Sequence, residues 1–164
     1  MSSFNRRTVL LGSLATALAG CGFTPAYGPG GSATQLNGTI LVDEPTTRPA
    51  YLLTRHLEDR LGRASNAQYG LSYAINISES AIAISPNDVT LRYNVLGDVT
   101  YALRDLGTGA VVTSGKVDSF TSYSTTGTTV ATQASQKDAE NRLMTILGDQ
   151  IVTRLIVAAP GLPA

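Results

Sequence analysis

The sequence has little of what most catalytic and metal sites require. Its 164 residues include one cysteine, one histidine and no tryptophan. A single cysteine excludes a disulfide within the chain and any cysteine cluster that holds zinc or an iron–sulfur centre. A single histidine excludes metal sites built from several imidazoles. The composition therefore disfavours large classes of enzymes before any motif is considered.

Charge is also scarce, and neither sign dominates. Charged residues make up 15% of the chain, and 12 basic residues balance 12 acidic ones. A nucleic-acid-binding protein needs a basic stripe to neutralise phosphates, so this class is disfavoured. Apolar residues at 43% are too many for a disordered chain. A chain of this length has the size of one domain.

The first twenty residues have the pattern of an export signal. Arg6 and Arg7 precede a run of twelve apolar or small residues, from position 8 to position 19. A bilayer span takes about 20 residues, so this run fits a removable signal peptide over residues 1–20 better than a permanent anchor. Paired arginines are compatible with both the general secretory and the twin-arginine route.

The segment Leu18-Ala19-Gly20-Cys21 resembles the bacterial lipobox. The resemblance implies that Cys21 receives a diacylglycerol thioether, that cleavage follows Gly20, and that the new amino terminus is N-acylated. The thiol is needed because its thiolate is the nucleophile that takes the lipid. Several acyl chains anchor a protein stably, whereas one binds only marginally. Gly22, where an Asp would retain the protein in the inner membrane, favours the outer membrane.

The mature chain is predicted to be a short tether followed by one domain. Proline and glycine interrupt any regular pattern in residues 21–38, so this segment is expected to be an irregular lipidated tether. The domain is expected to span residues 39–160. Strands are predicted at 39–43, 71–78, 91–104 and 110–122, with a bulge near Gly115, a loop at 122–132, and helices at 49–61 and from 135–138 to 157.

The clearest pattern is the alternation along residues 91–104. Apolar and aromatic residues occupy the odd positions apart from Gly97, and mostly polar residues occupy the even ones. Such alternation predicts a sheet with one buried and one wet face. The order strand–helix–three strands–helix predicts an α+β two-layer sandwich, with a mostly antiparallel four-stranded sheet and two helices on one face.

No motif for catalysis is present in the sequence. His56 is the only group that titrates near neutrality when unperturbed, and it lies at the edge of a helical apolar stripe without a Gly-x-Ser-x-Gly nucleophile. The glycine-rich segments at 28–31 and 107–109 lack the Gly-Lys-Ser/Thr of a phosphate-binding loop. We therefore predict no catalytic residue, no metal and no cofactor beyond the covalent lipid on Cys21.

Three basic residues are candidates for binding an anionic ligand. Arg92 and Arg104 share the wet face of their strand by parity, and Lys116 on the next strand approaches the same face. Such a group suits the phosphates of an anionic glycolipid. The alternative is scattered solvated charge, because three aspartates lie nearby in the sequence, Asp98, Asp105 and Asp118.

Four segments of the sequence together have the pattern of a known family. The first is LAGCGFTPAYG at 18–28. The other three are YALRD at 101–105 with the turn Thr108-Gly109, SFTSY at 119–123, and DAENRL at 138–143 continuing to DQIVTRL at 149–155. These segments resemble the lipopolysaccharide-assembly lipoproteins called LptE, in their alphaproteobacterial form. The first is similar to that family's Cys-Gly-Phe-x-Pro-Leu-Tyr-Gly opening, with Ala26 in place of the larger aliphatic residue.

The resemblance implies a role in binding and assembly rather than catalysis. Family members sit inside the large outer-membrane β-barrel LptD, help it assemble, plug it, and bind lipopolysaccharide on its way to the cell surface. The resemblance therefore implies a lipoprotein anchored on the periplasmic side of the outer membrane. The polar loop 122–132 and the wet strand face are the predicted contacts. A lipoprotein adaptor or pilotin for another channel is the second interpretation, and a periplasm-facing hydrolase the third.

Overall fold

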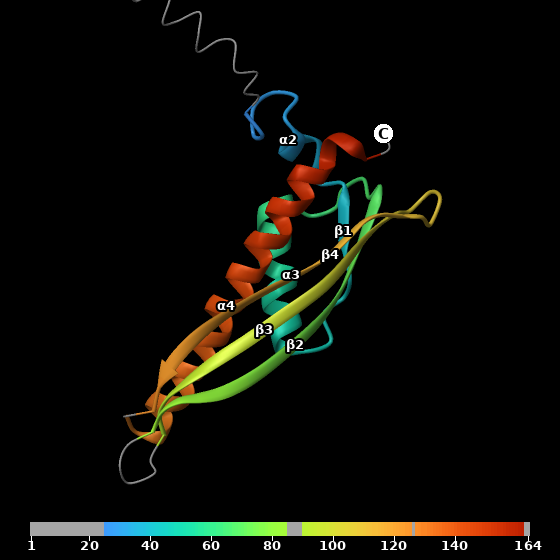
Figure 1. Ribbon diagram of the computed structural model, residues 1–164. Coiled ribbons are helices and arrows are strands. Elements are labelled where there is room, and N and C mark those ends of the chain that lie inside the picture. Colours follow the sequence, from blue (N-terminus) through green and yellow to red (C-terminus); the bar gives the residue numbers. More distant parts are fainter. Residues whose placement is uncertain (1–24, 85–89, 126, 163–164) are drawn as a thin grey trace, which may run out of the picture.

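The structure is a computed structural model that describes residues 25–84, 90–125 and 127–162 (Figure 1). Its helices α3 and α4 lie over the same face of a twisted four-stranded sheet, and none of the described residues covers the opposite face (Figure 1). The elements are α2 Ser32–Leu36, β1 Ile40–Val42, α3 Arg48–Leu61, β2 Tyr69–Ile84, β3 Thr90–Asp105, β4 Val111–Ser124, α4 Thr129–Ala158 and the 3-10 turn η1 Ala159–Gly161.

The sheet has the strand order β1-β2-β3-β4, which confirms the predicted α+β fold. The pairs β2–β3 and β3–β4 are antiparallel. The short pair β1–β2 is parallel, because α3 carries the chain back to the end of the sheet where β1 begins. The sheet is therefore mixed, with one parallel pair beside a long antiparallel meander.

Helix α3 has the boundaries that its sequence signals predict. The Thr47 hydroxyl accepts a hydrogen bond from the Ala50 amide, and Pro49 occupies the first turn, where its missing N–H leaves nothing unpaired. The helix ends at Gly62, whose φ of 75° favours glycine. Its stripe of Leu53, Leu57 and Leu61 is buried in the core.

Helix α4 begins at Thr129, earlier than predicted, and β4 ends at Ser124, so the loop expected at 122–132 is shorter than predicted. Residues 122–124 complete β4, and the Thr128 hydroxyl caps the helix by accepting from the Ala131 amide. Threonine favours strands, and both serine and threonine favour helix caps as well as loops, which is why composition alone misjudged this segment. The helix and η1, Thr129–Gly161, are long and apolar enough to cross a membrane, but the apolar stripe of α4 is core: Ala139, Leu143, Met144, Leu147, Ile151, Val152 and Leu155 are buried.

Two glycines allow close packing on the helix side of the sheet. A Cβ at Gly97 would lie 2.9 Å from a methyl carbon of Leu143, so glycine lets α4 approach β3 closely. A Cβ at Gly115 would lie 2.9 Å from the Tyr101 hydroxyl oxygen. The bulge predicted near Gly115 is wrong: β3 and β4 stay in register there, and the extra residue is Val112.

The two long edges of the sheet differ in their protection. Along β4, side chains of α4 bind backbone carbonyls: Arg142 donates to Ser122, Gln150 to Asp118 and Arg154 to Lys116, at 3.1, 3.3 and 2.8 Å. Along β2, β1 pairs only with residues 69–71, and within the described ranges no strand pairs with the side of β2 that faces away from β3 from Ser72 onward.

The segment before β1 differs from the irregular tether expected for it. Residues 32–36 form α2, and Leu36 is only 2% exposed within the main core. The core therefore includes chain that composition assigned to the tether. Short helices rich in small polar residues have no strong sequence signal, since their stability comes from tertiary packing.

Candidate interaction surface

The uncovered side of the sheet, called the open face below, is composed mainly of small polar side chains. Alternation along three strands defines it, because successive side chains point to opposite sides of a sheet. Its members are the even-numbered residues of each strand: Ser72, Ala74, Asn76, Ser78 and Ser80 on β2, Arg92, Asn94, Leu96, Asp98, Thr100, Ala102 and Arg104 on β3, and Ser114, Lys116, Asp118, Phe120, Ser122 and Ser124 on β4.

A polar cluster occupies the middle of the open face. The Asn76 Nδ2 donates to Asp98 Oδ1 at 3.2 Å, and the Lys116 Nζ lies 3.2 Å from Asp98 Oδ2. These hydrogen bonds, first from Asn76 and then from Lys116, hold the pKa of the Asp98 carboxyl below its ordinary value. The cluster lines a shallow hollow of about 330 Å³. Asp98 therefore keeps its charge and fixes the two neighbouring side chains.

An apolar pair lies beside this cluster. Leu96 and Phe120 are partners across β3 and β4, and they remain 41% and 63% exposed. Both line the same hollow as Asp98 and Lys116. Single exposed apolar side chains are ordinary on a protein surface. A cross-strand apolar pair next to a fixed polar group differs, because one place on the surface can then contact both apolar and polar groups of a partner.

The structure places all three predicted basic residues on the open face but does not bring them together. Arg92 and Arg104 are twelve residues apart on one strand, about 40 Å at the rise of a β-strand. Lys116 pairs with Thr100 across the strands and forms an ion pair with Asp98. The three residues do not form one phosphate site, and their contact with lipopolysaccharide stays a prediction. Cys21 lies outside the described residues.

Sequence reasoning placed the three basic residues on the uncovered side of the sheet but missed the Asn76–Asp98–Lys116 cluster and the Leu96–Phe120 pair. The cluster depends on strand register, which the sequence does not display. The pair had a signal: Leu96 and Phe120 are large apolar residues at positions whose parity is otherwise polar.

His56 joins the two long helices. Its Nε2 lies 2.9 Å from Asp149 Oδ1, and the Arg60 Nε lies 3.6 Å from the same oxygen. Gly148 permits this approach, because a Cβ there would lie 2.6 Å from the His56 Cδ2. Among the residues that the structure describes, no three His, Cys, Asp or Glu side chains form a group that could hold a metal ion. The position of His56 thus supports a structural role.

A second polar cluster lies where β2, β4 and α4 meet. The Tyr123 hydroxyl donates to Glu79 Oε2 at 3.1 Å, and the Gln136 Nε2 donates to Glu79 Oε1 at 2.8 Å. The Tyr123 ring stacks on Tyr93, with centroids 5.6 Å apart. Burial, followed by the bond to Glu79, raises the pKa of Tyr123 to about 12.

This raised pKa predicts a loss of stability in alkali. Between its ordinary pKa of 10.0 and about 12, the folded protein retains a proton on Tyr123 that the unfolded chain releases. The free energy of unfolding therefore falls as pH rises through this window. We expect Tyr123→Phe to have a shallower fall, measured by urea unfolding at about pH 9 and about pH 11. An equal decrease in the free energy of unfolding in both proteins would contradict the raised pKa of Tyr123. Tyr69 and Tyr73 also have raised pKa values, so some decrease with pH remains in both proteins.

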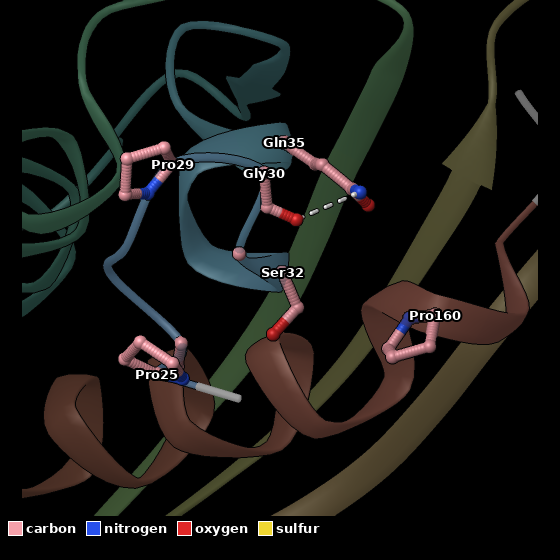
Figure 2. A pocket seen from close by; sticks show the side chains of 8 residues that line it. Pro25, Pro29, Gly30, Ser32, Gln35 and Pro160 are labelled. Carbon is pink, nitrogen blue, oxygen red and sulfur yellow. Dashed lines mark hydrogen bonds between the residues drawn. The ribbon is translucent and has the colours of Figure 1, made fainter. Parts of the chain in front are cut away.

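Another hollow, of about 440 Å³, lies between the segment before β1 and η1 (Figure 2). Its wall consists of residues from both ends of the described chain, including Pro25, Ser32, Gln35 and Pro160. The Gln35 Nε2 donates to the Gly30 carbonyl at 3.5 Å, as the dashed line in Figure 2 marks. Among the described residues, those that line it are uncharged.

Comparison with known families decides the identity of the chain. The model of the LptE family, described as lipopolysaccharide-assembly, matches residues 38–155. The chain belongs to this family. The match runs from the residues before β1 to the last turns of α4, so it includes the whole open face. As an LptE-family member, the chain is a component of lipopolysaccharide assembly in the Gram-negative envelope.

Solved structures share the fold of this LptE-family chain. A lipoprotein of Caulobacter crescentus CB15 matches with a TM-score of 0.69 and 24% identity, over 82% of this chain and 100% of its own. Rare lipoprotein B of Shewanella oneidensis matches with a TM-score of 0.58 and 13% identity, over 75% and 96%. A minor lipoprotein of Acinetobacter baumannii matches with a TM-score of 0.52 and 18% identity, over 76% and 92%. No curated protein sequence matches the chain.

Proposed function

We propose that this LptE-family chain is an outer-membrane lipoprotein, anchored through acyl chains on Cys21 on the periplasmic side. In this role it binds the large lipopolysaccharide-export barrel LptD, helps it assemble and plugs its lumen, and so supports delivery of lipopolysaccharide to the cell surface. The family match over residues 38–155 is the observation that carries this proposal. The role is one of binding and assembly rather than catalysis.

The open face supports contact with the inside of a barrel. The lumen of an outer-membrane barrel is polar, and the open face presents serine, asparagine and threonine side chains to any surface placed against it. Leu96 and Phe120 add an apolar contact point in its middle, where binding energy usually concentrates. Arg92 and Arg104 extend the face towards its two ends, where each can meet a separate phosphate of lipopolysaccharide.

Affinity purification from detergent-solubilised outer membranes of the native host tests this function. We expect the tagged wild-type chain to retain a large barrel of the lipopolysaccharide-export type in stoichiometric amount, identified by mass spectrometry. We expect Phe120→Asp to lower that yield about tenfold or more, since a desolvated aromatic contact at an interface centre is commonly worth 2 kcal/mol or more.

Tyr51→Asp is the matched control, because Tyr51 is an aromatic residue that is 55% exposed on α3, outside both the open face and segment 122–132. Thermal unfolding of both variants verifies that they fold. A preparation without a barrel, or with a secretion channel instead, would overturn the proposed function. A barrel retained equally by both variants would leave the function standing and remove the open face from the contact.

A further inference from the structure

The segment that leads from the lipid-bearing end into the domain is folded. Residues 25–36, called the collar below, form two tight turns followed by α2 (Figure 2). The Gly28 amide donates to the Pro25 carbonyl at 3.0 Å, and the Gly31 amide donates to the Gly28 carbonyl at 2.8 Å. The Ala33 amide donates back to the Ala26 carbonyl at 3.0 Å. These bonds fix the collar in a compact shape.

The collar is also attached to the body of the domain. Leu36 is 2% exposed and belongs to the main core, and Ala33 is 9% exposed. The Gly38 amide donates to the Leu61 carbonyl at the end of α3, at 2.8 Å. On the other side, α2 contacts η1 and α4, and Pro160 closes the hollow in Figure 2. The collar therefore moves with the domain.

A folded collar shortens the distance that the lipid anchor can reach. Four residue steps separate Cys21 from Pro25, and a fully extended chain covers at most about 14 Å in four steps. A tether that stayed extended to Gly38 would cover about 60 Å. The start of the collar is thus held within about 14 Å of the anchor in any conformation of the four steps. This limit on the distance rests on the proposed lipid attachment at Cys21.

The chemistry of this end suits a lipid surface. Neither residues 25–42 nor residues 155–162 include a charged side chain. Figure 1 shows the β3–β4 turn at the same end of the long axis as α2 and the last turns of α4. Tyr27, Leu106 and Val157 at this end are 66%, 49% and 76% exposed. Tyrosine and aliphatic side chains are the groups that the membrane interface accepts. The acid of the β3–β4 turn, Asp105, accepts hydrogen bonds from the Thr108 amide and hydroxyl within the turn.

From these observations we infer that the collar end is a membrane-facing surface. The collar, η1 and the β3–β4 turn rest on the head groups of the leaflet that holds the anchor, and the long axis of the domain points away from that contact. The opposite end, where α4 begins, lies about 40 Å along the helix from Val157. The collar fixes the orientation of the domain as well as its attachment.

Head-group quenching on vesicles tests this orientation. The full acylated chain is bound to phosphatidylethanolamine–phosphatidylglycerol vesicles that include a spin-labelled head group. A fluorophore is attached to Ala110→Cys in the β3–β4 turn, or to Val130→Cys at the far end; Cys21 is blocked by its lipid. We expect several-fold stronger quenching at position 110 than at position 130.

A collar variant separates orientation from attachment. A Cβ at Gly31 would overlap the Ala26 carbonyl, so Gly31→Leu must open the collar. We expect this variant to remain acylated and vesicle-bound while quenching at position 110 falls towards that at position 130. In the protein with the wild-type collar, weak or equal quenching at positions 110 and 130 would overturn the inferred orientation. If that protein is still acylated and bound to the vesicles, the proposed anchoring would stand. A mature chain without acyl mass, or one that does not bind vesicles, would instead overturn the proposed anchoring.

Discussion

Replacing Cys21 by Ser is expected to abolish lipid attachment and delivery to the outer membrane. A hydroxyl is a far weaker nucleophile than a thiolate, so the diacylglycerol thioether cannot form, and the cleavage that depends on it does not follow. The product should retain residues 1–20 and lack any acyl mass. Intact-protein mass spectrometry, together with separation of inner and outer membranes, measures both effects.

Ser32→Ala is the control for this change, because Ser32 lies eleven positions after Cys21 and outside the lipobox. It should yield the same acylated, cleaved product as the wild type. Acyl mass on the Cys21→Ser protein, or normal cleavage after Gly20, would show that the lipobox resemblance is wrong. The effect is the largest that we expect, since it removes the membrane anchor entirely.

Replacing Leu143 by Ala is expected to lower the free energy of unfolding by about 2–5 kcal/mol. Leu143 is fully buried where α4 crosses β3, and Gly97 brings the two backbones close together there. Removing its side chain leaves a cavity that a helix and a sheet already in close contact cannot collapse to fill. Urea unfolding, with the slope against denaturant compared between proteins, measures the change.

Leu96→Ala is the matched control for the core. Leu96 loses the same atoms, but its side chain lies on the open face and is 41% exposed. We expect it to cost about 1 kcal/mol or less, because much of the side chain is already in water. Equal losses from the two variants would mean that α4 does not cover β3 as described.

Elements with local signals were predicted well from the sequence. The two ends of α3 are marked by Thr47, Pro49 and Gly62, and β3 is marked by its alternation of apolar and polar residues. These signals lie close together in the sequence, so they were enough to predict both elements and the buried face of the sheet. The single parallel pair did not alter the predicted order or class.

Elements that depend on distant contacts were predicted poorly. Strand β2 extends past Ser78 although Glu79 interrupts its pattern, because Tyr123 and Gln136 bind that carboxylate from β4 and α4. The collar folds because Leu36 fits the core, and the composition of glycine and proline around it gave no sign of this. The cluster on the open face required the register of β2 against β3, which pairs Asn76 with Asp98.

The unequal protection of the two sheet edges limits how free chains can associate. An open strand edge is a template for another strand, and unlimited growth of a fibre requires an open edge on both sides of every copy. Here α4 side chains occupy carbonyls along β4, while β2 beyond Leu71 has no strand on the side away from β3 in the described part of the chain. Two copies that join through β2 leave only their protected β4 edges outside. Edge-to-edge pairing therefore ends at a closed pair and does not propagate into a fibril.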